Sequence, residues 1–216
     1  MTDFAAARRH MVDGQLRTTD VTDLRILTAM DEEPRERFLP PAFAGIAYLD
    51  MAPPTGVAGR NLLKPMVLAK MIQAAEVTNT DKVLDIGCAT GYGAAVLARI
   101  AAQVVALEQD QGLAQTAKTA LAGDAKVSVV TGPLAAGWPS GAPYDVILLE
   151  GAAEVVPPAL LQQLAVGGRL VCVEGAGPGA KATVYRRSGE DIGTRAVFDA
   201  AAGVLPGFEK PLEFAF

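Results

Sequence analysis

One acid and three glycines stand close together where a short apolar segment of the chain ends. Residues 83–86, VLDI, include Asp85, and Gly87, Gly91 and Gly93 follow. This pattern predicts a buried strand, a tight turn and then a helix whose first backbone N–H groups have no helical partner. Such a helix start carries a partial positive charge and suits an anionic or polar ligand group.

A second acid, Glu108, follows the next predicted strand, residues 104–107. On a neighbouring strand end, its carboxylate is placed to bind the hydroxyls of a ribose. The glycines are spaced G-x-x-x-G-x-G, which differs from the dinucleotide fingerprint G-x-G-x-x-G. Asp85 would repel a pyrophosphate but attract an ammonium group, such as the one at the amino-acid end of S-adenosylmethionine (SAM). These residues therefore favour a SAM site, and the alternative is a structural turn with a surface glutamate.

Composition narrows the class of protein. The chain of 216 residues is 50% hydrophobic and 20% charged, with a net charge of −5 and no long basic block. These values predict a globular protein that does not bind nucleic acid. No apolar run approaches the roughly 18 residues of a membrane span, and the start has no signal-peptide core, so we expect a cytoplasmic protein that does not bind membranes. The two cysteines, Cys88 and Cys172, fall in or beside predicted core strands, so we expect neither a disulfide nor a metal site. His10 is the only histidine, which disfavours histidine-based acid–base catalysis.

Strands and helices alternate from residue 81 onward. The predicted strands are 82–86, 104–107, 127–130, 146–149 and 170–173, and the predicted helices are 91–101, 110–122 and 157–165. This order predicts an α/β fold with a doubly wound, Rossmann-like, mostly parallel sheet. Residues 182–187 and 193–200 are too close in sequence for a helix between them, so they predict a final antiparallel strand pair. The tail, 203–216, is expected to pack along the sheet edge.

The first 80 residues have a different pattern. They predict helices at 3–16, at about 21–30 and from Pro65 onward, with an irregular Pro- and Gly-rich loop over 46–63. We therefore expect an N-terminal helical segment with a substrate-side loop over 1–80. Residues 81–216 form the predicted SAM-binding domain, and the two parts make one compact unit.

Most of the chain resembles the protein-L-isoaspartate O-methyltransferase family. The resemblance rests on MVDGQLR, ILTAMDEEPRERFLP, AYLDMAPPTGVAGRNLLKPMVLAKM, VLDIGCATGYGAAVLA and APYDVILLEGAAEVVPPALLQQLAVGGRL. It implies a seven-stranded SAM-methyltransferase sheet, methylation of a carboxylate, and protein or peptide substrates that contain isoaspartyl residues. By position it implies that Glu108 binds the ribose of SAM. The other residues that it places at the cofactor are Asp85, Gly87, Cys88, Gly91, Tyr92, Gly132, Pro133 and Leu134.

Several positions depart from the family pattern. Leu63 stands where the family has a serine close to the methyl-accepting carboxylate, and Lys64 replaces the glutamine that follows. Ala89 replaces a glycine of the turn, and Pro133 replaces an acid beside the adenine. Glu150 occupies a strand end where the family has a small or hydroxyl residue, and its charge would repel a carboxylate substrate.

These departures leave alternatives open. In the first, the chain is a SAM-dependent carboxyl O-methyltransferase in which Arg60, Asn61 or Lys64 replaces the serine donor, and the acceptor has possibly changed. A carboxylate acceptor is already ionised at neutral pH, so this reaction needs no general base. In the second, the chain is a catalytically inactive module that binds SAM or a protein. A metal-dependent methyltransferase with Glu150 as ligand is disfavoured, because adjacent strand ends supply no second carboxylate. The sequence does not indicate the oligomeric state.

Overall fold

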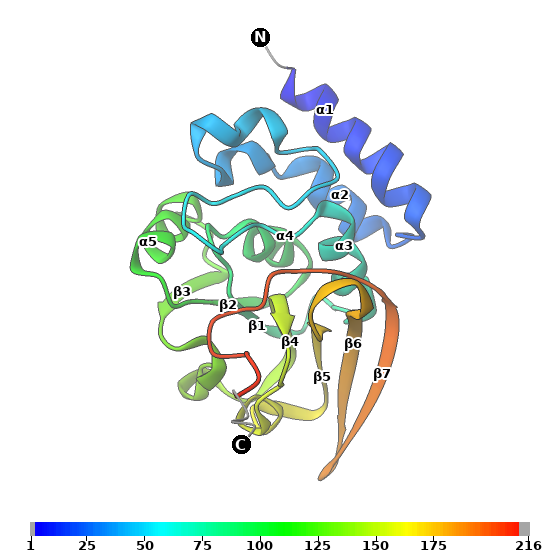
Figure 1. The fold of residues 1–216 in the computed structure, drawn as a ribbon, viewed down its shortest axis with the longest axis vertical. Coiled ribbons are helices and arrows are strands. Elements are labelled where there is room, and N and C mark those ends of the chain that lie inside the picture. Colours follow the sequence, from blue (N-terminus) through cyan, green and yellow to red (C-terminus); the bar gives the residue numbers. More distant parts are fainter. Residues whose placement is uncertain (1–2, 212–216) are drawn as a thin grey trace, which may run out of the picture.

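The fold is built on a seven-stranded sheet in the order β3-β2-β1-β4-β5-β6-β7, and the computed structural model describes residues 3–211 (Figure 1). The strands are β1 (Lys82–Ile86), β2 (Gln103–Glu108), β3 (Val127–Thr131), β4 (Tyr144–Ala153), β5 (Leu164–Glu174), β6 (Lys181–Ser188) and β7 (Asp191–Asp199). Strands β1 to β5 pair in parallel, whereas β6 is antiparallel to both β5 and β7. The predicted doubly wound sheet with a final antiparallel pair is confirmed.

Six α-helices are present in the described part of the chain. They are α1 (Phe4–Met11), α2 (Leu24–Glu32), α3 (Pro65–Ala74), α4 (Tyr92–Ile100), α5 (Gln111–Ala120) and α6 (Pro158–Leu161). Shorter helical segments cover Val12–Leu16, Arg17–Thr19, Arg35–Phe38, Pro41–Ile46, Leu134–Ala136, Pro139–Gly141 and Gly177–Gly179. In Figure 1 the N-terminal segment, blue to cyan, covers the end of the sheet towards which β4 points.

Two helix boundaries differ from the sequence prediction. Helix α2 begins at Leu24, not near residue 21, because the side chain of Asp23 caps it by accepting a hydrogen bond from the Arg25 backbone N–H. Helix α6 is much shorter than the predicted 157–165, because the chain joins the sheet at Leu164, opposite Tyr144 of β4. Pairing with β4 therefore determines where this helix ends.

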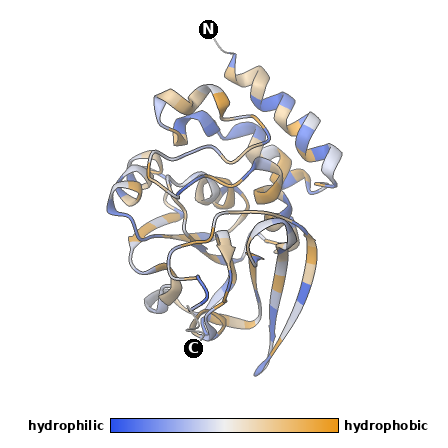
Figure 2. Ribbon diagram, in the orientation of Figure 1, coloured by the Kyte–Doolittle hydropathy of each residue, from blue (hydrophilic) through white to orange (hydrophobic). Residues whose placement is uncertain are grey.

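Apolar side chains fill both faces of the sheet. On β1, Val83 belongs to one buried cluster and Leu84 to the other, as expected when successive residues of a strand point to opposite faces. The cluster that contains Val83 also contains Met30 and Leu68 from the N-terminal segment. That segment therefore shares a core with the sheet. In Figure 2 the hydrophobic colour is spread over the strands and the helices that face them.

The described part of the C-terminal tail crosses the sheet instead of following its outer edge as predicted. Backbone hydrogen bonds join Ala152 of β4 to Gly203 (2.8 Å) and Leu205 (2.9 Å), and Glu154 to Phe208 (2.9 Å). Leu205 and Phe208 are buried in the second cluster, so burial of these side chains explains the path. The rest of the predicted tail, 212–216, lies outside the described residues.

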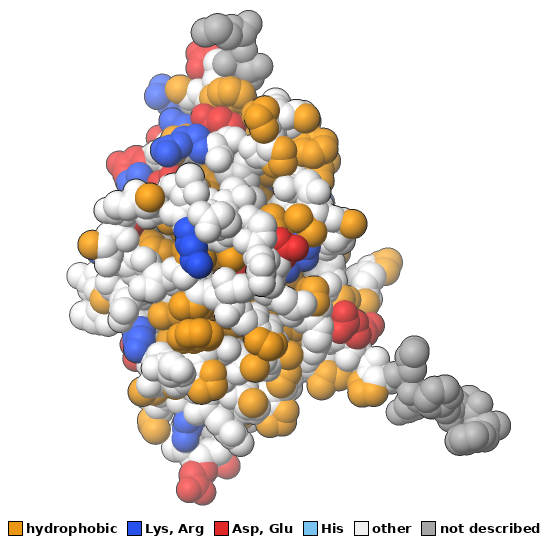
Figure 3. Space-filling model, turned by 90° about the vertical axis from the view of Figure 1, so that its left-hand side faces the viewer, with side chains coloured by type: hydrophobic (Ala, Val, Ile, Leu, Met, Phe, Trp, Pro, Cys, Tyr) orange, Lys and Arg blue, Asp and Glu red, His pale blue; other side chains and the backbone are white. Residues whose placement is uncertain are grey.

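A membrane span requires a long apolar helix, and a basic binding surface requires clustered Lys and Arg side chains. Among residues 3–211, no helix combines the length and the hydropathy that a membrane span requires. On the face drawn in Figure 3, Lys and Arg side chains stand singly or beside acidic ones. That face therefore has no continuous basic surface.

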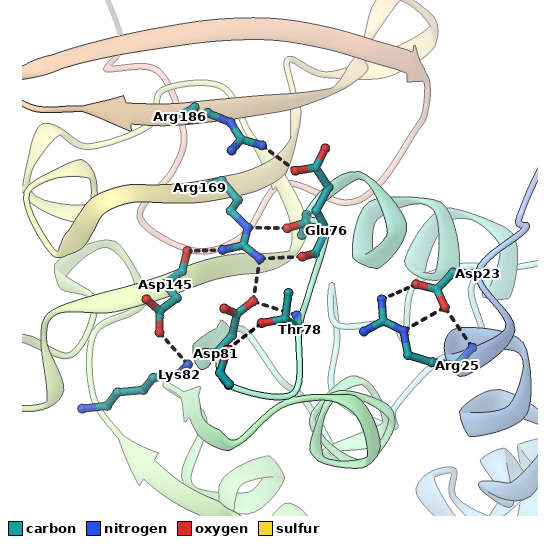
Figure 4. Close-up of polar contacts among 11 residues, drawn as sticks. Asp23, Arg25, Glu76, Thr78, Asp81, Lys82, Asp145, Arg169 and Arg186 are labelled. Carbon is teal, nitrogen blue, oxygen red and sulfur yellow. Dashed lines mark hydrogen bonds and ion pairs between the residues drawn. The ribbon is translucent and has the colours of Figure 1, made fainter.

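A buried ion pair between Arg169 and Asp81 links two strands to a loop at the amino ends of the strands (Figure 4). Arg169 of β5 donates to Oδ2 of Asp81 at 2.5 Å and to the Glu76 carbonyl oxygen at 2.6 Å, and it also bonds the Ala75 and Asp145 carbonyl oxygens. Both side chains of the pair are 10% exposed. Arg169 therefore connects β5 and β4 to the loop that leads from α3 into β1.

Replacing Arg169 with alanine is expected to lower the free energy of unfolding by about 3–5 kcal/mol, because Asp81 would remain buried without its counter-charge. Urea denaturation followed by circular dichroism measures this loss. Arg186→Ala is the matched control, since its ion pair with Glu76 is 50% and 64% exposed and should contribute less than about 1 kcal/mol. An equal loss of unfolding free energy in the two variants would contradict a larger contribution from the buried pair.

Candidate active site

The turn between β1 and α4 has the predicted strand–turn–helix geometry. Gly87 (φ 76°) and Gly91 (φ 97°) adopt left-handed backbone conformations that glycine accepts without strain. Ala89 has φ 50°, so the residue that departs from the family's glycine lies where a Cβ costs about 1 kcal/mol. The N–H groups of Gly87 and Cys88 donate to the Leu107 carbonyl oxygen at 2.8 and 3.2 Å. The amides of Gly87 and Cys88 are therefore bonded within the protein.

Glu108, at the carboxyl end of β2, forms a buried ion pair with Arg60. Nη1 of Arg60 donates to Oε1 at 3.0 Å and Nη2 donates to Oε2 at 2.6 Å, and the two side chains are 7% and 0% exposed. Backbone N–H groups supply further bonds to the carboxylate, from Ala89 (2.9 Å), Gln109 (2.7 Å) and Asp110 (3.0 Å). Glu108 thus accepts five hydrogen bonds from the protein itself.

A closed loop holds Arg60 in this position. The Arg60 carbonyl oxygen accepts bonds from the backbone N–H (3.1 Å) and hydroxyl (2.8 Å) of Thr55, and Leu62 N–H donates to Pro53 at 3.0 Å. Nη2 of Arg60 also donates to the Gly87 carbonyl oxygen at 3.1 Å. The substrate-side loop is therefore bonded both to the β1 turn and to the end of β2.

Two further carboxyl groups, Asp85 of β1 and Glu150 of β4, are buried next to this pair and contact each other. The expectation that adjacent strand ends supply no second carboxylate near Glu150 is therefore wrong. Burial raises the pKa of Asp85 to about 7; contact with Glu150 partly offsets this rise, and the charge of Glu108 adds to it. Burial and the neighbouring Asp85 raise the pKa of Glu150 well above its usual range. A Cβ on Gly93 would lie 2.0 Å from Oε1 of Glu150, so glycine is required there for Glu150 to fit. The two acids are thus protonated far more readily than exposed carboxylates.

Arg35 is a site residue that the sequence analysis missed. Its side chain is fully buried, donates to the carbonyl oxygens of Ala47 (2.9 Å) and Leu63 (2.6 Å), and lies 4.5 Å from the ring centre of Tyr92. Burial lowers the pKa of Arg35, and burial raises that of Tyr92 to about 12. Nothing in the segment PRERF distinguishes Arg35 from Arg37, because the difference arises from contacts with residues distant in sequence.

The other predicted site residues lie around the same strand ends. Gly132 N–H donates to the Glu108 carbonyl oxygen at 3.1 Å, Pro133 is exposed and Leu134 is part of the core. Cys88 is a free, buried thiol whose pKa is raised, chiefly by burial. Among the described residues, no group of three His, Cys, Asp or Glu is placed to hold a metal ion.

Two spaces border Arg60. The inner one is a cavity of about 40 Å³, and the residues that line it include Asn61, Leu63, Lys64 and Glu150. The outer one is an open groove of about 580 Å³ between residues 57–60, residues 109–112 and the tail. The inner cavity is far below the roughly 300–1,000 Å³ of small-molecule sites.

SAM does not fit the strand ends in this conformation. Oε1 of Glu108 already accepts three hydrogen bonds and Oε2 accepts two, so a ribose diol could bind only by displacing the two from Arg60. Leu205 also covers the glycines, with Cδ2 3.0 Å from the place that a Cβ on Gly87 would take and Cγ 2.6 Å from that of Gly151. The protein's own side chains thus stand where the cofactor was expected.

The strand order, the glycine turn and the strand-end acids define a Rossmann-like methyltransferase fold. Residues 6–197 match the family described as protein-L-isoaspartate(D-aspartate) O-methyltransferase. The chain belongs to this family.

Individual relatives agree with this membership. The chain is 40% identical over 212 residues to protein-L-isoaspartate O-methyltransferase 1 of Rhodopseudomonas palustris (strain HaA2), covering 96% of this chain and 86% of the relative. It is 42% identical over 190 residues to the enzyme of that name from Methylorubrum extorquens (strain PA1), covering 88% and 83%. A solved protein-L-isoaspartate O-methyltransferase aligns with a TM-score of 0.82 and 25% identity, over 92% of this chain and 66% of that chain. A Plasmodium falciparum structure described as a putative member in complex with S-adenosyl-L-homocysteine has the same fold, with a TM-score of 0.77, 15% identity and coverage of 92% and 97%.

The raised pKa of Asp85 predicts a specific dependence of stability on pH. The folded protein keeps this proton up to about pH 7, whereas the unfolded chain releases it near the ordinary value of 3.8. The free energy of unfolding therefore falls as pH rises from about 3.8 to about 7. Above about pH 7 the folded protein bears the full cost of an ionised, buried Asp85.

Asp85→Asn removes this titration and is expected to stabilise the protein more at pH 8 than at pH 5, by roughly 2 kcal/mol. Urea denaturation of both proteins at the two pH values measures the difference. A stability gain that is the same at pH 5 and pH 8 would contradict the raised pKa.

Proposed function

We propose that this chain is a SAM-dependent methyltransferase whose acceptor is a carboxylate. The observation that carries the proposal is the family match across residues 6–197, together with relatives at 40–42% identity that are named protein-L-isoaspartate O-methyltransferases. The related structure in complex with S-adenosyl-L-homocysteine supports SAM as the methyl donor. Protein or peptide chains with isoaspartyl residues are the acceptors that the relatives' names suggest.

We assign the cofactor to the strand ends beside β1 and β2, in a state where Arg60 and Leu205 have withdrawn. The residues proposed to border it are Asp85, Gly87, Cys88, Gly91, Tyr92, Glu108, Gly132, Pro133 and Leu134. No chemical step is assigned to the conformation described above, because the cleft is then filled.

The acceptor side is assigned to the loop that borders the inner cavity, residues 60–64. Once Arg60 has withdrawn from Glu108, the candidate donors towards an acceptor carboxylate are Arg60, Asn61 and Lys64, which line this cavity. Asn61 is exposed and Lys64 is half-buried at the start of α3. Glu150 has a pKa raised by burial, so it would retain its proton and would not repel a carboxylate in the way expected from the sequence.

Incubation with radiolabelled SAM and an isoaspartyl peptide tests the proposed function. The expected product is a base-labile methyl ester, and the same peptide with an ordinary aspartate is the matched control. Methylation of an acidic protein mixture but not of the peptide would indicate a changed acceptor. Absence of both methyl transfer and SAM binding would overturn the proposal.

Leu63→Ser is expected to increase kcat/KM for the isoaspartyl peptide at least about tenfold, which corresponds to roughly 1.4 kcal/mol of transition-state stabilisation. The reason is that the leucine side chain lines the inner cavity but offers no donor there. Leu63→Ala is the matched control, because it creates at least as much space without a hydroxyl group. If both variants gain equally, space and not hydrogen bonding limits the wild-type activity.

A further inference from the structure

The inner cavity and the outer groove share part of their lining, namely residues 59–60 and the tail segment 203–206. Arg60 borders both spaces. Successive residues of the tail alternate between them, since Gly203 and Leu205 line the inner cavity while Val204 and Pro206 line the outer groove. Arg60 and the tail segment 203–206 therefore lie between the two spaces.

The contacts of Arg60 resemble those that a ribose diol would make with Glu108. Two N–H groups of one guanidinium donate to the two oxygens of the carboxylate, at 3.0 and 2.6 Å. A diol likewise presents two neighbouring O–H donors. Arg60 and a ribose would thus compete for the same acceptor atoms.

Leu205 covers the backbone at the ends of β1 and β4. Its side chain is 4% exposed and lies against Gly87 and Gly151, where glycine leaves the backbone of two adjacent strand ends uncovered. The segment is fixed by its backbone bonds to Ala152, and Phe208, 1% exposed, is buried beyond it. Both obstructions to a ligand are therefore ordered parts of the fold.

We propose that the inner cavity and the outer groove are two parts of one SAM cleft and that Arg60 and Leu205 form a partition across it. SAM binds only by displacing this partition, so the folded protein is held in a low-affinity state. This inference rests on the proposed function. It concerns the affinity of the site, whereas the proposed function concerns which cofactor the site takes.

Removal of Arg60 leaves Glu108 hydrogen-bonded. Glu108 then loses its counter-charge, at a cost in stability like that of Arg169→Ala, but its carboxylate still accepts the N–H groups of Ala89, Gln109 and Asp110. Removal of the leucine side chain at 205 leaves the backbone bonds of the tail in place. Both variants are therefore expected to fold with the cleft widened.

The test is titration calorimetry of S-adenosyl-L-homocysteine into the wild type, Arg60→Ala, Leu205→Ala and the double variant. Each single substitution is expected to lower the dissociation constant at least about tenfold, and the double substitution is expected to lower it further. Thermal unfolding of each variant establishes that it is folded at the temperature of the titration.

Arg169→Ala is the matched control, since it removes another buried ion pair, 10% exposed on both sides, at the opposite end of the strands. It should destabilise the protein and leave the affinity unchanged. A similar gain of affinity in this control would show general loosening and would overturn the partition. Wild-type affinity equal to that of the Arg60 and Leu205 variants would overturn the partition and leave the proposed function standing. If every variant is folded and none binds, the proposed function fails and the partition fails with it.

Discussion

The closed state of the cleft depends on the ion pair between Arg60 and Glu108. It joins the loop before α3 to the end of β2, and through the Gly87 carbonyl oxygen to the turn after β1. Buried ion pairs repay the cost of desolvation only when their remaining hydrogen bonds are satisfied. Here the three backbone donors to Glu108 meet that condition. An exchange of Arg60 for two ribose hydroxyls would keep the acceptor satisfied, so the same strand end can support both states.

This pair also influences the protonation of its neighbours. Three carboxyl groups, Asp85, Glu108 and Glu150, are buried near two guanidinium groups, Arg35 and Arg60. Burial of all three carboxylates in ionised form would leave an excess negative charge of one in a region of low dielectric constant. The raised pKa values of Asp85 and Glu150 reduce this excess, because the proton is kept where no guanidinium pairs directly with the acid.

Much of the fold could be predicted from periodicity, because strands and helices are determined by local patterns. The strand, turn and helix around Gly87 were predicted to within one residue at each end. The length of α6 and the path of the tail could not be, since both depend on pairing with β4. Asp85 and Glu108 were correctly placed at adjacent strand ends, but the direction of Arg60 is set by a contact 48 residues along the chain.

A family resemblance and a filled cleft are compatible because they concern different features of the chain. The family match and the similar solved structure concern the backbone, including the turn at Gly87 and the strand order. Protein interiors do not retain large apolar voids, so a concave surface of glycine backbone favours an apolar side chain that can reach it. Leu205 reaches it because β4 holds the tail across the strand ends. Whether the cleft binds a ligand therefore depends on the side chains that enter it, Arg60 from the loop and Leu205 from the tail. The backbone alone does not determine it.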